Sequence, residues 1–234
     1  MLGAVRHNDK TSIAHIFTEG TGYASFIFYS TGTGKSSRIN ALLQPLTLLR
    51  FERNGAAGPG LLHLKEPVNG YPFGSIPFSP QKSCIAMFLS EFLTHALRNE
   101  NEGAGTIYAF LKDAILELDS SASVWNLHIY TMLRIAEFIG IGPNTDDYFP
   151  GCRFDLQNGT FQAAQPAHAY FMEPDKAYKV AMLLQCGDAG ATGSIPLTGP
   201  ERASILVSLN TFYRLHLPGF PILKSIEILQ TMFN

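Results

Sequence analysis

The sequence predicts an α+β chain in which a small β-barrel is followed by a mainly helical region. Three observations indicate this order. Turn sequences rich in glycine, asparagine and proline recur every eight to twelve positions through the first eighty residues. Beyond Pro80, apolar residues recur at helical spacing. The segment Phe154–Phe161 contains Asn158-Gly159, a pair that favours the tight turn of a β-hairpin within the helical part.

Short strands occupy the intervals between the turns of the first eighty residues, and they are rich in aromatic and β-branched residues. They are predicted over Gly3–His7, Ser12–Thr18, Tyr23–Ser30, Leu46–Arg53 and Leu61–Val68. Strands of this number and length favour a small closed barrel, because an open sheet of that size would leave its edges unprotected.

The helical part begins at the start signal Ser79-Pro80. Apolar spacing predicts one helix from this point, a second across Ile107–Leu118 and a third across roughly Ala122–Ile139. The third ends where glycine and proline follow at 140–143. Three more helices complete the chain, and they are predicted to begin near Pro174, Pro200 and Pro221.

The composition is that of a folded, reduced protein. Hydrophobic residues make up 46% and charged residues 15% of the 234 residues, which argues against disorder. No membrane span is expected, because no apolar run is long enough, and the first ten residues lack the apolar core of a signal peptide. Cys84, Cys152 and Cys186 lie far apart without a CxxC pair, so free cysteines and no metal or other cofactor are expected.

Positive charge is concentrated in the first part of the chain. Residues 1–80 contain seven Lys/Arg and four Asp/Glu, whereas residues 81–234 contain ten and fifteen. The two parts therefore carry about +3 and −5, which together give the net charge of −2. A basic module joined to an acidic one is predicted, and a basic module favours nucleic acid as a partner.

The segment Gly32–Ser37 is similar to the end of a phosphate-binding loop of the G-x-x-x-x-G-K-[ST] type. The spacing fails, because position 29 is tyrosine where that loop requires glycine, and strand-like sequence follows instead of a helix. Nucleotide hydrolysis is therefore the least favoured interpretation. Lys35 and Arg38 on this glycine-rich hairpin can contact phosphate oxygens without fixed geometry, and an ordinary solvated hairpin tip is the alternative.

Further cations of the first eighty residues are interleaved with aromatic residues. The cations are Arg6, Lys10, Arg50, Arg53 and Lys65. The aromatic residues are Tyr23, Phe26, Phe28, Tyr29 and Phe51. Single-stranded nucleic acid needs both, since charge follows the backbone and rings stack on bases. In a small barrel most rings point inward, so core packing is the default interpretation for Phe26 and Phe28.

No residue pattern of a catalytic site is found. The seven histidines are dispersed, without an HExxH motif or an i,i+4 pair. Asp146-Asp147 lies between Pro143 and Pro150 and is interpreted as a solvated turn rather than as a pair of acid and base. Trp125 is interpreted as a core or interdomain anchor. We therefore expect no enzymatic activity.

Several segments share their order and spacing with one known family. These segments are Asn8–Ser12 followed by Phe17–Gly22, Ala41–Leu49 with its Leu-Gln-Pro sequence, Lys82–Leu93, and Gly219–Ser225 with its Leu-Lys-Ser sequence. Together they resemble the bacterial RecO family of recombination-repair mediators, almost over the whole chain. Two departures stand out: the first strand is shorter than in the family, and the four-cysteine zinc module of some relatives is missing around Cys152–Cys186.

The resemblance implies an OB-fold domain over residues 1–80 that contacts DNA. It also implies a helical domain over residues 81–234, with an inserted hairpin near 152–163, that docks partners. Proteins of the family bind single- and double-stranded DNA and anneal complementary strands. They act with RecR and with the acidic C-terminal tail of single-strand-binding protein to load a recombinase. A non-catalytic protein of the cytoplasm, associated with the nucleoid, is implied.

The sequence thus predicts a DNA-binding recombination mediator. The predicted DNA contacts are Arg6, Lys10, Lys35, Arg38, Arg50 and Arg53. The alternative is a protein-docking scaffold of the repair machinery that touches DNA weakly, because the cations of the basic hairpin are few.

Overall fold

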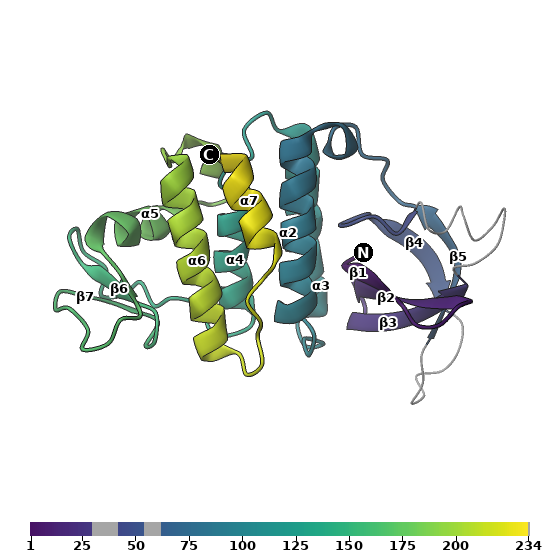
Figure 1. The fold of residues 1–234 in the computed structure, drawn as a ribbon, viewed down its shortest axis with the longest axis horizontal. Helices are drawn as coiled ribbons and strands as arrows, with labels where there is room; N and C mark the ends of the chain where they lie inside the picture. The colour runs from purple at the N-terminus through teal and green to yellow at the C-terminus, as the bar shows by residue number, and fades with distance from the viewer. Residues whose placement is uncertain (30–41, 54–61, 234) are drawn as a thin grey trace.

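The α+β fold is confirmed by a computed structural model, which describes residues 1–29, 42–53 and 62–233. A five-stranded sheet lies at one end of the molecule, and helices with a small three-stranded sheet make up the rest (Figure 1). In the part of the chain that is described, no helix combines the length and the apolar composition needed to cross a bilayer.

The five strands of the N-terminal sheet follow the predicted intervals closely. They are β1 (Gly3–Arg6), β2 (Thr11–Thr18), β3 (Gly22–Tyr29), β4 (Leu49–Arg53) and β5 (Leu62–Asn69). Their spatial order is β1-β2-β3-β5-β4, in which β3 and β5 run parallel and all other neighbours antiparallel. This is the Greek-key arrangement of a partly open OB barrel.

The two outer strands of the sheet approach each other through the chain segment before β4. The Met1 carbonyl accepts a hydrogen bond from the Leu46 N–H at 2.9 Å, and the Met1 amine donates to the Thr47 carbonyl at 3.0 Å. Leu46 is buried and adopts a left-handed conformation with φ of 60°. The fourth strand therefore begins at Leu49 and not at Leu46, because this conformation is incompatible with an extended strand.

The barrel has a small apolar core of its own. Its buried members are Met1, Ala14, Ile16, Phe26, Phe28 and Leu64. Phe51 packs edge-on against Phe26, with ring centroids 5.0 Å apart. The prediction that Phe26 and Phe28 belong to the core is confirmed, so these two rings are not available to a ligand.

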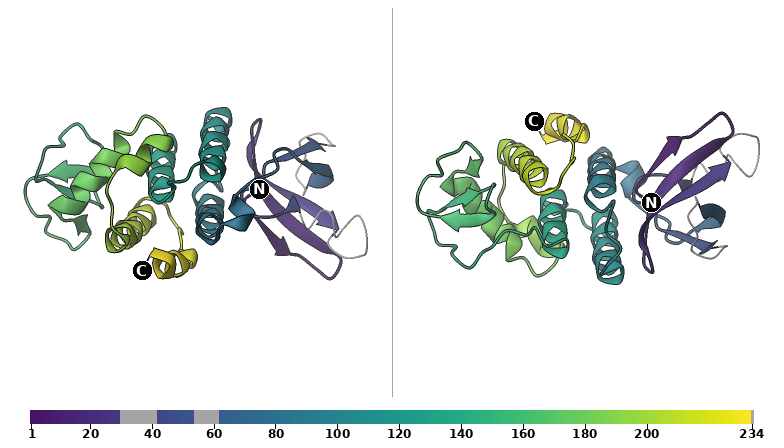
Figure 2. Two further views of the ribbon diagram at one scale, coloured as in Figure 1. Left: turned by 90° about the horizontal axis from the view of Figure 1, so that it is seen from above. Right: turned by 90° about the horizontal axis from the view of Figure 1, so that it is seen from below.

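Six α-helices follow the barrel. They are α2 (Pro80–Ala96), α3 (Ala104–Ser120), α4 (Leu127–Phe138), α5 (Pro174–Leu184), α6 (Gly199–His216) and α7 (Ser225–Phe233), and 3₁₀ turns lie at Ile76–Phe78 and Gly190–Ser194. Figure 2 shows α2 and α3 standing between the barrel and the other helices. The larger apolar core extends from barrel residues Leu2 and Phe17 through all six helices.

The predicted hairpin is confirmed and is part of a three-stranded sheet. Strands β6 (Arg153–Asp155) and β7 (Thr160–Gln162) pair antiparallel around Gly159, whose φ of 68° suits the turn. A third strand, β8 (Phe171–Met172), which the sequence did not indicate, pairs with the other side of β6. In Figure 1 this sheet lies at the end of the molecule opposite to the barrel.

Two helices begin later than predicted. The third predicted helix begins at Leu127 and not near Ala122, and α7 begins at Ser225 and not near Pro221. In the first case the Asn126 side chain donates to the carbonyls of Thr192 and Ile195, at 3.0 and 2.9 Å, and so ties the preceding segment to a distant loop.

The interpretation of Trp125 as a core or interdomain anchor is wrong. Its side chain is 37% exposed, and the guanidinium of Arg202 in α6 lies over its ring at 5.3 Å from the centroid. The contact is a cation–π interaction within the helical part of the chain.

Candidate nucleic-acid interface

The strand registers bring several of the predicted contacts to one end of the barrel. β3 begins beside the helices, where the Tyr23 N–H donates to the Glu100 carbonyl, and it ends at Tyr29. Tyr29 pairs with Thr11, next to the β1–β2 turn. The end of the barrel that faces away from the helices is called the distal end here. Its described residues are those of the β1–β2 turn (Arg6–Thr11), Tyr29 and, by its backbone, Arg53 at the end of β4.

The β1–β2 turn holds Arg6 and Lys10 in fixed places on the backbone. The Asn8 side-chain oxygen accepts the N–H groups of Lys10 and Thr11 at 2.9 and 2.8 Å, which closes a local turn. Both cationic residues are exposed. Because the backbone is set by this turn, only side-chain rotation is needed for either cation to meet a phosphate.

Arg6 is partly neutralised by its neighbour Asp9. Their Nη2 and Oδ1 atoms are 3.1 Å apart, and the two side chains are 71% and 97% exposed. Such an exposed pair contributes about 0–1 kcal/mol and is readily exchanged for a phosphate. Among the described residues Lys10 has no salt bridge. Lys10 is therefore the freer of the two cations.

The two arginines of β4 lie at opposite ends of the strand. Arg53 pairs with Leu64 at the distal end, whereas Arg50 pairs with Val68 close to the helices. A strand rises about 3.3 Å per residue, so the two backbone positions are about 10 Å apart. Lys35 and Arg38 lie outside the described residues. The backbone position of Arg53 thus lies at the same end of the barrel as the turn that carries Arg6 and Lys10, whereas that of Arg50 lies away from it.

The aromatic residues of β3 differ in their availability. Tyr29 is 64% exposed at the distal end, where a base could stack on its ring. Tyr23 is half-buried and stacks on His15, with ring centroids 5.7 Å apart. Burial, followed by the nearby charge of Arg98, lowers the pKa of His15. His15 therefore adds no positive charge to this surface at neutral pH.

A cleft separates β4 from α3 at the other end of the barrel, and Arg50 lies on its wall. The cavity has a volume of about 560 Å³. Its polar and aromatic lining residues are Phe17, Thr18, Glu19, Thr47, Arg50, Phe51, Tyr71, Tyr108 and Lys112. Burial and the nearby Glu19 carboxylate raise the pKa of Tyr108. Lys112 was missed in the sequence, because it is 62 positions from Arg50 and its helical neighbours give no sign that it lines the same cleft.

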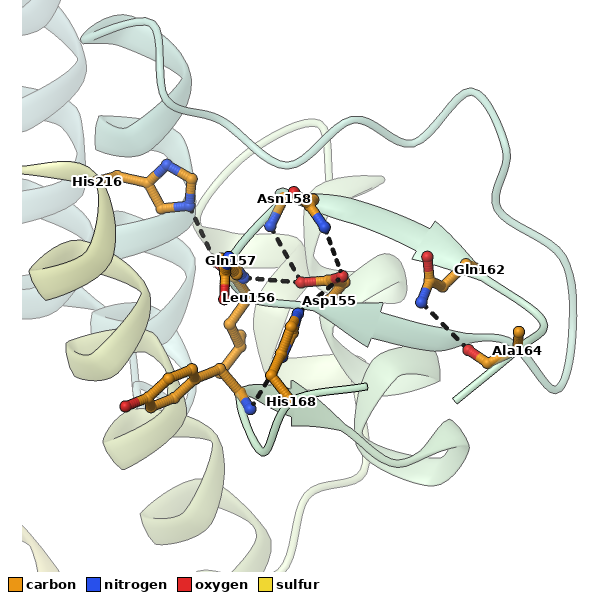
Figure 3. Close-up of polar contacts among 9 residues, drawn as sticks. Asp155, Leu156, Gln157, Asn158, Gln162, Ala164, His168 and His216 are labelled. Atoms are coloured by element: carbon orange, nitrogen blue, oxygen red, sulfur yellow. Dashed lines mark hydrogen bonds and ion pairs between the residues drawn. The ribbon is translucent and has the colours of Figure 1, made fainter. Parts of the chain in front are cut away.

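The hairpin of the helical part is held by the buried carboxylate of Asp155 (Figure 3). It accepts the N–H groups of Gln157 and Asn158 at 2.8 and 3.0 Å, and the Asn158 side-chain amide at 2.8 Å. His168 Nε2 lies 3.4 Å from the same carboxylate. The backbone N–H of Tyr170 donates to His168 Nδ1 at 3.2 Å, so Nε2 carries the ring proton and faces Asp155.

The described residues do not meet the requirements of a metal site. No three His, Cys, Asp or Glu side chains in that part of the chain lie close enough together to hold a metal ion. Cys152 is buried and Cys84 and Cys186 are half-buried, all three as free thiols. Asp146 and Asp147 are exposed in a turn, which confirms their interpretation as a solvated turn. The phosphate-loop-like segment Gly32–Ser37 lies outside the described residues.

Comparison with known proteins identifies the same family by its sequence model and by its relatives. The family described as recombination protein O, C-terminal, matches residues 77–225. The chain is 37% identical over 235 residues to a DNA repair protein RecO of Phocaeicola vulgatus, covering 100% of this chain and 97% of the relative. It is 31% identical over 231 residues to the RecO protein of Azobacteroides pseudotrichonymphae, covering 98% and 95%. The RecO protein of Flavobacterium psychrophilum is 28% identical over 238 residues.

Proposed function

The chain belongs to the RecO family of recombination-mediator DNA repair proteins, and from this premise we propose that it binds single-stranded DNA and anneals complementary strands without a catalytic step. Annealing requires charge neutralisation on two strands and no bond chemistry. The proposed contacts are Arg6, Lys10, Lys35, Arg38 and Arg53, with Arg50 at the margin. Double-stranded DNA, RecR and the acidic tail of single-strand-binding protein are proposed as further partners.

The observation that best supports this proposal is the common position of Arg6, Lys10 and Arg53. Arg6 ends β1 and Lys10 lies in the turn that leads into β2, so both belong to one hairpin. The backbone of Arg53, at the end of β4, comes to the same end of the barrel from a distant part of the sequence. The exposed ring of Tyr29 lies at the same end. Cations that follow a backbone, together with a ring for stacking, are what OB folds use to hold single strands.

Salt-dependent binding of a fluorescent oligonucleotide tests the proposal. Each phosphate contact on a single strand contributes about 0.7 to the slope of log K against log salt. We expect the Lys35→Ala, Arg38→Ala double variant to lose about one to two units of slope. A slope equal to that of the unmodified protein would reject the loop as a DNA contact. Absence of salt-sensitive binding in the unmodified protein would reject the proposed function.

A protein-docking scaffold with weak DNA contact is the second candidate. Two observations favour it: Asp9 offsets the charge of Arg6, and the apolar side chain of Val5 on strand β1 is 52% exposed. Under this alternative, the same oligonucleotide binds only after RecR is added. Tight binding by the isolated chain at moderate salt would favour the mediator instead.

A further inference from the structure

We propose that the cleft between β4 and α3 binds unpaired bases of a single DNA strand, with Arg50 and Lys112 contacting phosphates and Tyr71 and Tyr108 contacting bases. The inference rests on the proposed function and extends it, because it adds the helical part of the chain to the DNA interface. It also predicts that the chain prefers single strands to a duplex.

The cleft has the size and shape of a ligand site. Its volume of about 560 Å³ lies within the range of roughly 300–1,000 Å³ found for small-molecule pockets. Its apolar floor comes from β2, from the segment before β4 and from α3, and includes Phe17, Leu48, Leu111 and Ile115. A space of this size accepts about one or two bases and excludes a base-paired duplex.

The charges at the cleft favour an anion. Arg50 and Lys112 are both exposed, and neither takes part in a salt bridge among the described residues. Glu19 is the one carboxylate of the lining, so the lining carries a net charge of about +1 from these three side chains. The two cations come from opposite walls, β4 and α3, so a chain lying in the cleft can be held from both sides.

Two tyrosines give the cleft its aromatic surface. Tyr71 is 39% exposed, and its ring is supported by Phe73 at 6.0 Å between centroids. Tyr108 is half-buried on α3. A ring that is partly exposed and packed against a neighbouring ring suits base stacking, which contributes about 1–3 kcal/mol per base irrespective of sequence.

Strand β4 connects the cleft to the distal end. Arg50 borders the cleft, and the backbone of Arg53 lies about 10 Å farther along the strand, toward the distal end. A polynucleotide that contacts the distal cations can therefore continue into the cleft within the 4–16 nucleotides that an OB fold typically covers. This continuity favours nucleic acid over an acidic peptide, which has no need of the distal cations.

Binding of a single-stranded oligonucleotide to charge and ring variants tests the proposal. We expect Arg50→Ala, Lys112→Ala to lower the salt slope by about 1.4, for two phosphates. We expect Tyr71→Ala to weaken binding at least about fivefold, the lower limit of one stacked base. The matched control Lys176→Ala, Arg214→Ala removes one lysine and one arginine from α5 and α6, and its slope should equal that of the unmodified protein.

Photo-crosslinking identifies the ligand directly. An oligonucleotide that carries 5-iodouracil should crosslink to peptides containing Tyr71 or Tyr108, and a duplex competitor should not prevent it. One outcome separates the cleft from the proposed function. If the unmodified protein binds DNA, the distal variant Lys10→Ala, Arg53→Ala binds it more weakly and the cleft variants bind it as well as the unmodified protein, the cleft assignment is wrong. The proposed function then stands. Loss of acidic-peptide binding in the cleft variants, with oligonucleotide binding unchanged, would also overturn it.

Discussion

The carboxylate of Asp119, near the end of α3, accepts a hydrogen bond from the backbone N–H of Ser75 at 2.9 Å, although the two residues are 44 positions apart. The same carboxylate accepts the N–H groups of Gly74 and Ile76 at 2.8 and 2.9 Å. It thereby satisfies the first amide groups of the 3₁₀ turn Ile76–Phe78, which follows the barrel. Asp119 ties the segment between β5 and α2 to α3, and so helps to set the cleft.

Replacing Asp119 should weaken the whole fold. In Asp119→Ala the three N–H groups lose their acceptor, and charged hydrogen bonds of this kind contribute about 1.5–3 kcal/mol each. Because the three bonds share one carboxylate, its removal costs less than the sum of three separate bonds. We expect the free energy of unfolding in urea to fall by about 2–4 kcal/mol. The control is Asp113→Ala, an exposed carboxylate on the same helix. Equal stability of the two variants would contradict the role of Asp119.

The contribution of Asp119 should depend on pH in one direction. Burial raises the pKa of Asp119, but the hydrogen bonds from Gly74, Ile76 and Ser75 outweigh it, and the pKa lies below its ordinary value of 3.8. As pH falls, Asp119 is therefore protonated in the unfolded chain at a higher pH than in the folded chain. The stabilisation is complete above the pKa of the unfolded state and is lost as pH falls through the pKa of the folded state.

Urea unfolding of the unmodified protein and Asp119→Asn between pH 7 and 3 measures this dependence. We expect the stability difference between them to stay constant down to about pH 5 and to shrink below pH 4. A stability difference that grows on acidification would contradict the lowered pKa of Asp119 in the folded state.

Much of the fold could be predicted from local signals. Glycine-rich turns and runs of aromatic and β-branched residues predicted all five barrel strands, and the Asn158-Gly159 turn predicted the hairpin. The Ser79-Pro80 signal also holds, because Pro80 opens α2 and the Ser79 hydroxyl accepts the Lys82 N–H. These features depend on residues close together in sequence.

The features that were missed depend on distant contacts. The start of α7 is set by Glu91 of α2, more than a hundred positions away, and the start of α4 follows the ties of Asn126 to the segment near Thr192. The candidate site likewise has features that the sequence predicts and features that depend on distant contacts. The cations were identified from the sequence, but the separation of Arg50 from the distal end follows from strand register, and the shared cleft of Arg50 and Lys112 follows from helix packing.

Glu91 is expected to control the docking of α7. Its carboxylate accepts the N–H groups of Lys224 and Ser225 at 3.0 and 2.9 Å, and also the Ser225 hydroxyl. Burial raises the pKa of Glu91, but these bonds and the nearby His95 outweigh it and lower the pKa. The Leu-Lys-Ser sequence therefore has a structural role: Leu223 and Ser225 are buried at this contact and Lys224 is exposed.

Hydrogen exchange tests this role. In Glu91→Ala the first amide groups of α7 lose their acceptor, at a cost of about 1–3 kcal/mol. We expect faster exchange throughout α7 (Ser225–Phe233) and unchanged exchange in the barrel strands. Glu102→Ala, which removes an exposed carboxylate, is the control. Unchanged exchange in α7 would show that apolar packing alone holds the helix.

The hairpin sheet should be held by Asp155 and not by a metal. Burial raises the pKa of Asp155, but the hydrogen bonds of Asn158 and Gln157, together with His168, outweigh it and lower the pKa. We expect Asp155→Ala to lose about 2–4 kcal/mol of unfolding free energy. We expect EDTA to leave the Tm of the unmodified protein unchanged. A drop in Tm on chelation would point to a metal site instead.

Strand annealing tests the central claim most directly, namely that the cations of the distal end neutralise DNA strands. The rate at which two complementary labelled oligonucleotides anneal is followed by energy transfer, at low salt. We expect the Lys10→Ala, Arg53→Ala variant to lose most of the acceleration given by the unmodified protein, because fewer phosphates are neutralised. The Lys176→Ala, Arg214→Ala control, with the same change in charge, should retain it. Equal annealing rates for the two variants would contradict the account.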